Sequence, residues 1–250
     1  HSSDILGITI CDVGQGDAIF IRYHQIQILI DGGSSSRVLS CLSRNMPLFD
    51  QTLEYVIETH DDRDHVGGLA NILKRYKVEH YVSSEIYKST KTSKELQNLV
   101  KELLIPRVRG HAGIIIKENR VRMQCIWPTQ EFLEKMYVPE ENEDKGTSTR
   151  DRSNARSLVF RLEFGGFSAL FTGDLEISEE KIILTSGGDL QSVLLKIGHH
   201  GSKGSTSEEF LSAVRPKYAA ISAGKQNSYG HPSPRVLQLL QQHHIPFTRT

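Results

Sequence analysis

A short polar stretch directly after a buried strand constrains this sequence more than any other feature. The apolar run from Leu53 to Ile57 predicts a strand, and apolar residues at positions 66, 69, 72 and 73 predict a helix that begins soon afterwards. Between the two, residues 60–65 read His-Asp-Asp-Arg-Asp-His, which supplies two imidazoles and three carboxylates. A loop at the end of a strand can aim several of these side chains at one point. We therefore expect a sheet that carries a polar site at its rim.

The donor atoms of this loop favour a metal site. Imidazole and carboxylate ligands together suit borderline to hard divalent ions, so manganese, zinc or iron fits better than a soft copper site. The alternative is a solvated acidic loop in which Asp62 or Asp64 only caps the following helix. This alternative loses ground because other metal-type residues follow predicted strands later in the chain, namely Asp174, His199 and His200. Strand ends at one rim converge on a common crevice, so these residues predict a two-metal site.

Composition and charge exclude several classes of protein. The 250 residues hold 30 basic and 30 acidic side chains, so the net charge does not indicate a nucleic-acid binder, although a local basic groove is compatible with it. The three cysteines lack the spacing of a disulfide framework or a cysteine-ligated metal, and Cys11 and Cys125 are expected in the core. No apolar run reaches the length of a membrane span, and the first residues form no signal peptide. The abrupt ends of the sequence suggest a segment of a longer polypeptide.

The remaining sequence predicts two β-rich halves with helices outside. Strands are expected at 5–11, 18–23, 25–30, 78–82, 113–117, 120–127, 157–164, 167–172, 193–197 and 217–222, and helices at 37–42, 93–104, 178–185, 207–214 and 233–243. The opening strands are antiparallel, so Gly14-Gln15-Gly16 lacks the helix that a dinucleotide fingerprint needs. Residues 139–152 predict a mobile loop that either sits over an active site or is disordered. The two halves predict an α+β fold in which two sheets pack face to face between helical layers.

The polar motifs resemble those of the metallo-β-lactamase superfamily. The pattern His60-x-Asp62-x-Asp64-His65, then Gly173-Asp174, then His200 follows the order of that superfamily. The finer pattern is similar to the C-terminal domain of the ComEC family of DNA-uptake proteins, in residues 12–18, 29–33, 157–159, 171–175, 196–202 and 229–232. The resemblance implies an αββα four-layer sandwich, with residues 1–250 as one domain cut from a longer membrane protein.

The resemblance also implies a dinuclear metal centre. Its ligands would be His60 and Asp62 for one ion, Asp64, His65 and His200 for the other, and Asp174 as a bridge between the two. An ion-bound water of lowered pKa would be the nucleophile, and the two ions would clamp an in-line displacement at phosphorus.

Two departures from the superfamily pattern bear on the metal. Asp62 stands where the first motif, HxHxDH, has its second histidine, which favours manganese over zinc. The histidine of the third motif is missing, and Ser153-Asn154 occupies its approximate place. One ion is therefore expected to be ligand-poor and weakly held, and to bind fully only with a substrate phosphate. Both departures are expected within the ComEC family.

Further residues are candidates for catalysis and for substrate binding. Asp64 is counted as catalytic as well as a ligand. His199 would either orient a ligand or transfer a proton. His231, which precedes Pro232 in a polar loop, would contact the scissile phosphate or the leaving group, or else only stabilise its loop. The candidate phosphate contacts are Asn154, Lys203 and Lys225.

These features predict a metal-dependent nuclease that hydrolyses DNA. In the ComEC family such a nuclease would degrade the strand that is not taken up during natural transformation. The resemblance places it at the outer face of a bacterial cytoplasmic membrane. It would be a monomer with an attached or associated channel domain. An alternative substrate is a small, lipid or cell-wall phosphodiester, because phosphorylcholine esterases have a similar motif layout. Choline binding would need an aromatic cage, and this is disfavoured because Trp127 is the only tryptophan in the sequence. A non-catalytic binding domain is disfavoured further, because clustered carboxylates and histidines without a metal are costly.

Overall fold

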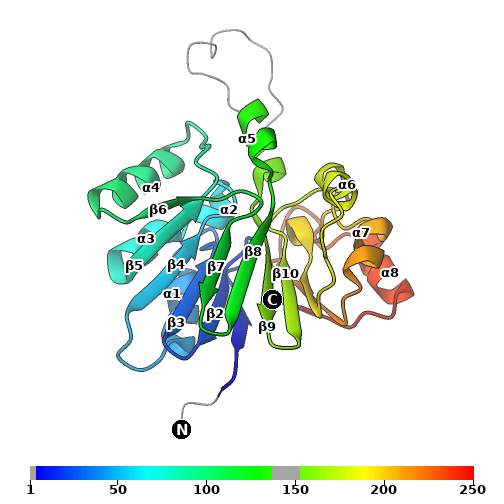
Figure 1. Ribbon diagram of the computed structural model, residues 1–250, viewed down its shortest axis with the longest axis horizontal. Coiled ribbons are helices and arrows are strands. Elements are labelled where there is room, and N and C mark those ends of the chain that lie inside the picture. The colour runs from blue at the N-terminus through cyan, green and yellow to red at the C-terminus, as the bar shows by residue number, and fades with distance from the viewer. Residues whose placement is uncertain (1–3, 137–152) are drawn as a thin grey trace.

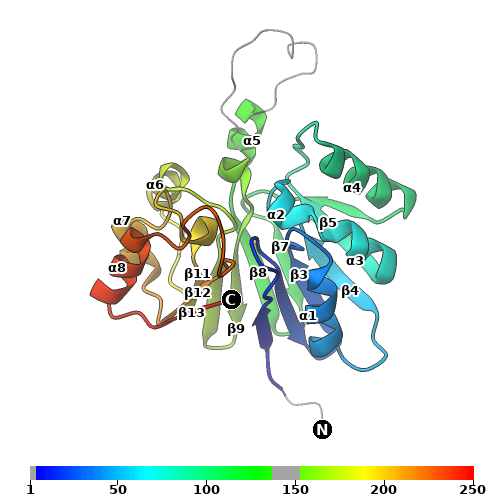
Figure 2. The same ribbon diagram turned by 180° about the vertical axis from the view of Figure 1, so that it is seen from behind.

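Two mixed sheets form the centre of the molecule, and helices cover both outer faces (Figures 1 and 2). The structure is a computed structural model that describes residues 4–136 and 153–250. The first sheet has the strand order β1-β2-β3-β4-β5-β6 and the second β13-β12-β11-β10-β9-β8-β7. The predicted αββα sandwich is therefore confirmed. The loop expected at 139–152 lies outside the described residues.

The first sheet begins antiparallel and continues parallel. Its antiparallel strands are β1 (Gly7–Ile10), β2 (Ile19–Tyr23) and β3 (Ile26–Ile30), and its parallel strands beyond β3 are β4 (Thr52–Ile57), β5 (Lys77–Ser83) and β6 (Arg107–Arg109). The helices of this half are α1 (Arg37–Asn45), α2 (Arg63–Val66), α3 (Leu69–Arg75) and α4 (Lys91–Glu102). Because each helical crossover returns the chain to the same edge, the carboxyl ends of β3, β4 and β5 meet at one rim.

The second half repeats this order. Antiparallel strands β7 (Ile115–Glu118), β8 (Val121–Trp127), β9 (Val159–Phe164) and β10 (Phe167–Phe171) precede parallel strands β11 (Leu194–Lys196), β12 (Tyr218–Ile221) and β13 (Phe247–Arg249). The helices are α5 (Gln130–Met136), α6 (Ile177–Thr185), α7 (Glu208–Val214) and α8 (Pro234–Gln242), with short 3-10 turns at Asn154–Arg156 (η2) and Gly198–Gly201 (η3). The sequence did not predict β6 or α5, which are short and lack a clear apolar period.

Three apolar layers hold the sandwich together. Alternation along β2 shows the division, because Ile19 and Ile21 pack in the layer between the sheets while Phe20 packs on the helical side with Val38 and Leu69. Strand β3 is buried on both faces, as expected for a strand covered by a sheet and by helices. A third layer packs the second sheet against α6, α7 and α8.

Cys11 is bonded to Cys41, which corrects the expectation of a plain core cysteine. The disulfide joins the end of β1 to α1, and its Cα atoms are 5.8 Å apart. The two residues are 30 positions apart in sequence, so only the fold brings them together. Cys125 is free and buried, as predicted.

Candidate metal centre

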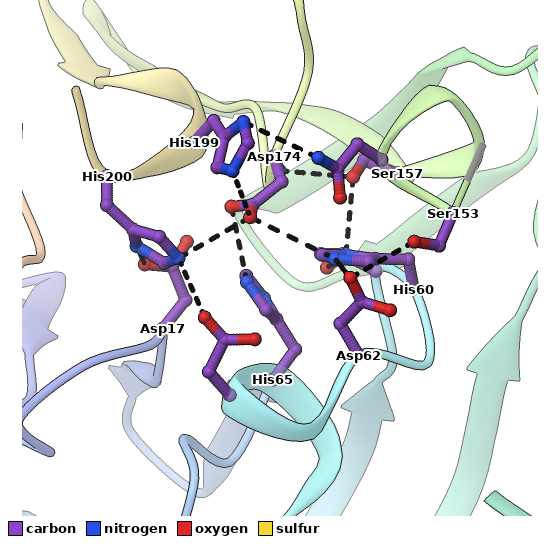
Figure 3. Close-up of polar contacts among 12 residues, drawn as sticks. Asp17, His60, Asp62, His65, Ser153, Ser157, Asp174, His199 and His200 are labelled. Atoms are coloured by element: carbon purple, nitrogen blue, oxygen red, sulfur yellow. Dashed lines mark hydrogen bonds and ion pairs between the residues drawn. The ribbon is translucent and has the colours of Figure 1, made fainter. Parts of the chain in front are cut away.

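The polar residues singled out in the sequence meet at the rim where strands of both sheets end (Figure 3). The loop after β4 carries residues 60–62, and α2 carries residues 64 and 65. Asp174 follows β10, and the 3-10 turn η3 after β11 carries His199 and His200. The six residues predicted as ligands therefore come from three segments that are far apart in sequence.

Asp174 lies at the centre of this cluster. Its Oδ1 atom is 3.2 Å from His65 Nε2, and its Oδ2 atom is 3.4 Å from His200 Nε2 and 4.0 Å from His60 Nε2. Asp64 Oδ2 lies 3.3 Å from His200 Nε2. One ligand atom from each of Asp64, His65, Asp174 and His200 lies within 4.8 Å of the others, which is close enough to surround a single cation.

Unpartnered buried atoms show that these residues fit a metal ion. The Nε2 atoms of His60, His65 and His200 and the Oδ1 atom of Asp174 are buried and have no hydrogen-bond partner among the described residues. Buried polar atoms without partners cost free energy, and native structures keep few of them. Divalent cations would satisfy all four atoms, and the mixed imidazole and carboxylate donors suit manganese, zinc or iron.

A buried carboxylate orients the ring of His65, and a backbone carbonyl orients the ring of His200. Asp31 Oδ2 accepts a hydrogen bond from His65 Nδ1 at 2.8 Å. His200 Nδ1 donates to the carbonyl of Ser222 at 2.9 Å and lies 3.3 Å from Asp17 Oδ1. A partner on Nδ1 fixes the tautomer and leaves Nε2 with a lone pair for a metal. These positions of Asp17 and Asp31 were not predicted, although Asp31 directly follows the apolar strand β3.

His60 is held differently from the other two imidazoles. Its Nδ1 atom contacts Thr59 Oγ1 at 3.1 Å and Ser157 Oγ at 3.3 Å, so hydroxyl groups orient this ring in place of a carboxylate. Ser157 Oγ also accepts the backbone N–H of Asp174 at 3.0 Å. One serine hydroxyl therefore links the first ligand loop to the central aspartate.

Asp62 points into the centre and does not cap a helix through its side chain. It occupies the N-cap position of α2, yet its carboxylate makes no capping hydrogen bond. Its Oδ1 atom pairs with the ammonium of Lys88, while its Oδ2 atom accepts from Ser153 Oγ at 3.0 Å and lies 3.7 Å from His60 Nε2. The structure therefore does not support the alternative in which Asp62 only caps the following helix.

A fully buried ion pair lies behind His200. Lys196 Nζ donates to Asp17 Oδ2 at 2.5 Å and to the carbonyl of Ile197 at 3.0 Å. Burial raises the pKa of Asp17, but the Lys196 ammonium and the imidazoles of His200 and His65 together outweigh this and hold the pKa well below its usual value. A lysine within the apolar strand 193–197 was the sequence signal for this pair, and it was not recognised.

Burial and neighbouring charges also set the pKa values of the ligand side chains. Burial, together with repulsion from His65, lowers the pKa of His60 to about 3. Burial opposes protonation of His65 and His200 as well, but the Asp174 carboxylate, together with Asp31 for His65 and Asp17 for His200, raises the pKa of both rings well above the usual value. Burial would raise the pKa of Asp64, yet its interactions with His200 and His65 together lower it to about 2.

Three of the five candidate substrate residues lie at the centre. His199 Nε2 is 3.7 Å from Asp174 Oδ2, and the ring of His231 lies 5.6 Å from that of His199, centroid to centroid. Asn154 Nδ2 donates to Glu176 Oε1 at 3.2 Å beside His199. The exposed ammonium groups of the other two, Lys203 and Lys225, form no ion pair with any carboxylate in the described part of the chain.

Gly16 allows the Asp17 turn to pack against the ligand loop. Its φ is +116°, and a Cβ at this position would lie 1.9 Å from the carbonyl oxygen of Asp64. In the same contact, the backbone N–H of Asp17 donates to that carbonyl at 3.2 Å. Only glycine lets the two segments approach this closely.

The chain belongs to the metallo-beta-lactamase superfamily. The model of that family matches residues 11–225, and the fold and motif order described above agree with it. The fold implies bound divalent metal ions, for which the described ligand cluster is the candidate site. The expected superfamily assignment is confirmed.

Three curated relatives narrow the assignment and agree with the expected ComEC resemblance. The chain is 32% identical over 261 residues to ComE operon protein 3 of Bacillus subtilis (97% of this chain, 31% of the relative). It is 29% identical over 246 residues to Competence protein ComA of Neisseria gonorrhoeae (97% and 30%) and 33% identical over 240 residues to Recombination protein 2 of Haemophilus influenzae (93% and 26%). The chain therefore spans less than a third of the length of each of these relatives.

Solved structures share the fold at low sequence identity. The metallo-beta-lactamase fold protein YhfI of Bacillus subtilis matches with a TM-score of 0.59 at 9% identity, over 98% of this chain and 97% of that one. CmlA, a diiron beta-hydroxylase of Streptomyces venezuelae, matches with a TM-score of 0.59 at 14% identity, over 99% of this chain and 53% of that one. These similarities concern the fold alone.

Proposed function

We propose that this chain is a metal-dependent nuclease that hydrolyses the phosphodiester bonds of DNA with two divalent ions. The observation that carries the proposal is the pair of ligand groups on either side of Asp174, with His60 and Asp62 on one side and Asp64, His65 and His200 on the other. The relatives include a competence protein and a recombination protein, and these names support DNA as the substrate.

The protein groups around the proposed ions would bind and orient the phosphodiester. When bound, two such ions supply an activated water and neutralise charge on the phosphate. The Ser222 carbonyl and the Asp31 carboxylate hold His200 and His65 with Nε2 directed inward. Burial lowers the pKa of His231 and so favours the neutral ring, which can donate one hydrogen bond to a phosphate oxygen. Lys203 and Lys225 are proposed to contact the flanking phosphates.

Manganese is the proposed metal, with zinc as the second choice. Three carboxylates, those of Asp62, Asp64 and Asp174, contribute to the ligand set, and oxygen donors favour manganese more than zinc. Asp62 stands where the superfamily motif has a histidine, so this position offers an oxygen donor. The Ser153 hydroxyl donates a hydrogen bond to Asp62 Oδ2 and holds that carboxylate in position.

We further propose that residues 1–250 form one nuclease domain of a longer protein. It would act as a monomer at the outer face of a bacterial cytoplasmic membrane, beside a channel domain, and degrade the strand that is not taken up. The fraction of each relative that the chain spans supports a longer protein, and the Cys11–Cys41 disulfide suits an oxidising compartment. No helix within 4–136 or 153–250 is long and apolar enough to cross a bilayer.

A small phosphodiester such as a phosphorylcholine ester is the second candidate substrate. The same metal chemistry would serve it, but choline recognition needs an exposed aromatic cage. Trp127 does not supply one, because it is buried and its Nε1 atom donates to the carbonyl of Ala155 at 2.8 Å. A non-catalytic domain is disfavoured by the buried unpartnered ligand atoms.

A substrate panel tests the proposal. Labelled single-stranded DNA, duplex DNA and p-nitrophenyl phosphorylcholine are each incubated with manganese, zinc, magnesium or EDTA. We expect manganese-dependent cleavage of DNA that Asp64→Ala abolishes and that Asp189→Ala, an exposed aspartate on another surface, retains. Intact DNA together with hydrolysed p-nitrophenyl phosphorylcholine would move the assignment to the small substrate.

A further inference from the structure

The loop between β12 and α8 carries an exposed aromatic ring beside the candidate metal centre. Tyr229 is 70% exposed, and its ring lies nearly parallel to that of His231, with 8° between the planes and 5.8 Å between the centroids. The ring of His231 in turn lies 5.6 Å from that of His199 and 6.5 Å from that of His200, centroid to centroid. Two ring-to-ring steps therefore lead from the exposed tyrosine to the centre.

Hydrogen bonds hold the backbone on both sides of this ring. Asn227 Oδ1 accepts the backbone N–H groups of Tyr229 at 3.1 Å and of His231 at 3.0 Å. Asn227 Nδ2 donates to the carbonyls of Gly224 at 2.7 Å and of His231 at 2.6 Å. Arg249, in β13, donates to the same two carbonyls at 3.0 Å and 3.1 Å. Because the loop is ordered by these contacts, a ligand that binds to the ring has less conformational entropy to remove.

The same loop packs against the turn that carries His200. The backbone N–H of Ser233 donates to the carbonyl of Gly201 at 2.8 Å. Gly201 has a φ of +82°, and a Cβ at this position would lie 2.6 Å from Cβ of Pro232, so glycine is needed for the two segments to approach this closely. The position of Tyr229 is therefore tied to the metal centre.

An exposed tyrosine by itself needs no explanation, because single apolar side chains are common on protein surfaces. Tyr229 differs from such a residue in its surroundings. It lies beside a group of candidate metal ligands, and Lys225, four residues earlier on the same loop, is an exposed lysine. Aromatic rings that stack on bases, together with cations that follow the phosphate backbone, are the combination that binds single-stranded nucleic acids.

We propose that Tyr229 stacks on an unpaired nucleobase of the strand whose phosphodiester is bound at the metal centre. This inference rests on the proposed nuclease function. Nucleotides along one strand of B-form DNA are about 3.4 Å apart, so ring-to-ring steps of 5.8 Å and 5.6 Å place such a base within about four nucleotides of a phosphate held at the centre.

The proposal assigns a substrate class to the site, namely strands with unpaired bases. A stacking ring accepts all four bases, because each of them has a π face, so Tyr229 should confer no sequence preference. In a duplex the bases are paired and stacked on their neighbours, and freeing one of them costs unpairing and unstacking energy. Tyr229 therefore selects for single-stranded DNA.

Binding to strands that resist hydrolysis tests the proposal on the whole 250-residue chain. Fluorescein-labelled phosphorothioate strands, one with thymine at every position and one with abasic residues throughout, are titrated in manganese and followed by fluorescence anisotropy. We expect the wild type to bind the thymine strand about 5- to 150-fold more tightly than the abasic strand. Tyr229→Ala should lose this difference and bind both strands as the wild type binds the abasic one.

Two further variants separate stacking from other effects. Tyr229→Phe should keep the difference between the strands, because the ring and not the hydroxyl stacks on a base. Tyr218→Ala removes a tyrosine that is 58% exposed at the start of β12, the end of that strand away from the metal centre, and should bind both strands as the wild type does. Circular dichroism checks the fold of each variant, and Tyr229→Ser replaces Tyr229→Ala if that variant unfolds.

Three results would overturn the proposal. They are equal binding of the two strands by the wild type, unchanged binding of the thymine strand by Tyr229→Ala, and an equal loss for both strands in Tyr229→Ala, which would show that the ring only supports its loop. The nuclease proposal fails separately. Base-dependent binding by a wild type that leaves ordinary single-stranded DNA intact refutes hydrolysis and retains the stacking site, whereas cleavage with base-independent binding refutes the stacking site alone.

Discussion

The ammonium of Lys88 pairs with the Oδ1 atom of Asp62 at the edge of the candidate metal centre. Both side chains are partly buried, with 21% and 26% of their surfaces exposed. The other carboxylate oxygen of Asp62 remains directed at His60. A fixed positive charge therefore lies beside one of the two proposed cation positions, where it opposes a bound ion and attracts a phosphate.

We predict that Lys88→Met tightens manganese binding at that position by about three- to tenfold, because a partly screened charge is removed. The same variant should raise the KM for DNA. Calorimetric titration measures the first effect and steady-state kinetics the second. Lys203→Met, at an exposed lysine without a described ion pair, is the control for metal affinity. Weaker binding in Lys88→Met would instead mean that Lys88 mainly orients Asp62 as a ligand.

Bound metal should stabilise the fold, because the ligand atoms of His60, His65 and His200 are buried without partners. At a free manganese concentration of 100 Kd, one site contributes about 2.7 kcal/mol, which corresponds to roughly 5–10 °C in Tm for a chain of this size. Differential scanning fluorimetry in manganese and in EDTA measures this shift. An identical Tm in both solutions would contradict a metal site built from these residues.

Removing Lys196 should destabilise the protein strongly, because it leaves Asp17 as a buried charge without its cation. We expect Lys196→Met to lower the free energy of unfolding by about 3–5 kcal/mol. The double variant Lys196→Met/Asp17→Asn should lose less, since neither partner then stays charged in the core. Urea unfolding of both variants measures the difference. A double variant that is less stable than Lys196→Met would argue that the pair is needed for a reason other than charge.

Thiol titration should report no reactive cysteine in the native protein. Cys11 and Cys41 are bonded, and burial raises the pKa of the Cys125 thiol to about 12, which keeps it from reacting. Unfolding without reductant should expose one thiol, and unfolding with reductant should expose all three cysteines of the sequence. Three thiols without reductant would show that the disulfide does not form.

The sequence was sufficient for features that are local along the chain. Apolar periodicity located the strands that end at the site, and the spacing within residues 60–65 indicated a metal loop before any contact was known. The order of that loop, Asp174 and His200 then indicated the superfamily. These signals are local because a strand and the loop that follows it adopt their structure from neighbouring residues.

Contacts between distant segments could not be read from the sequence. Lys196 and Asp17 are 179 positions apart, and Asp62 is paired with a lysine 26 positions away in a loop without periodicity. Glu176 lies two residues after Asp174, and nothing in the sequence singled it out. Only the packed structure shows that its carboxylate turns toward His199.

The most direct measurement of the central claim is cleavage of labelled single-stranded DNA as manganese is titrated into metal-stripped protein. We predict that activity reaches its plateau at two equivalents of manganese and disappears in EDTA. We also predict that Asp174→Asn, which removes the carboxylate shared by both ion positions, lowers the cleavage rate by more than about a thousandfold. Cleavage that persists in EDTA or in Asp174→Asn would contradict a dinuclear metal nuclease, as would DNA left intact by protein that has bound both ions.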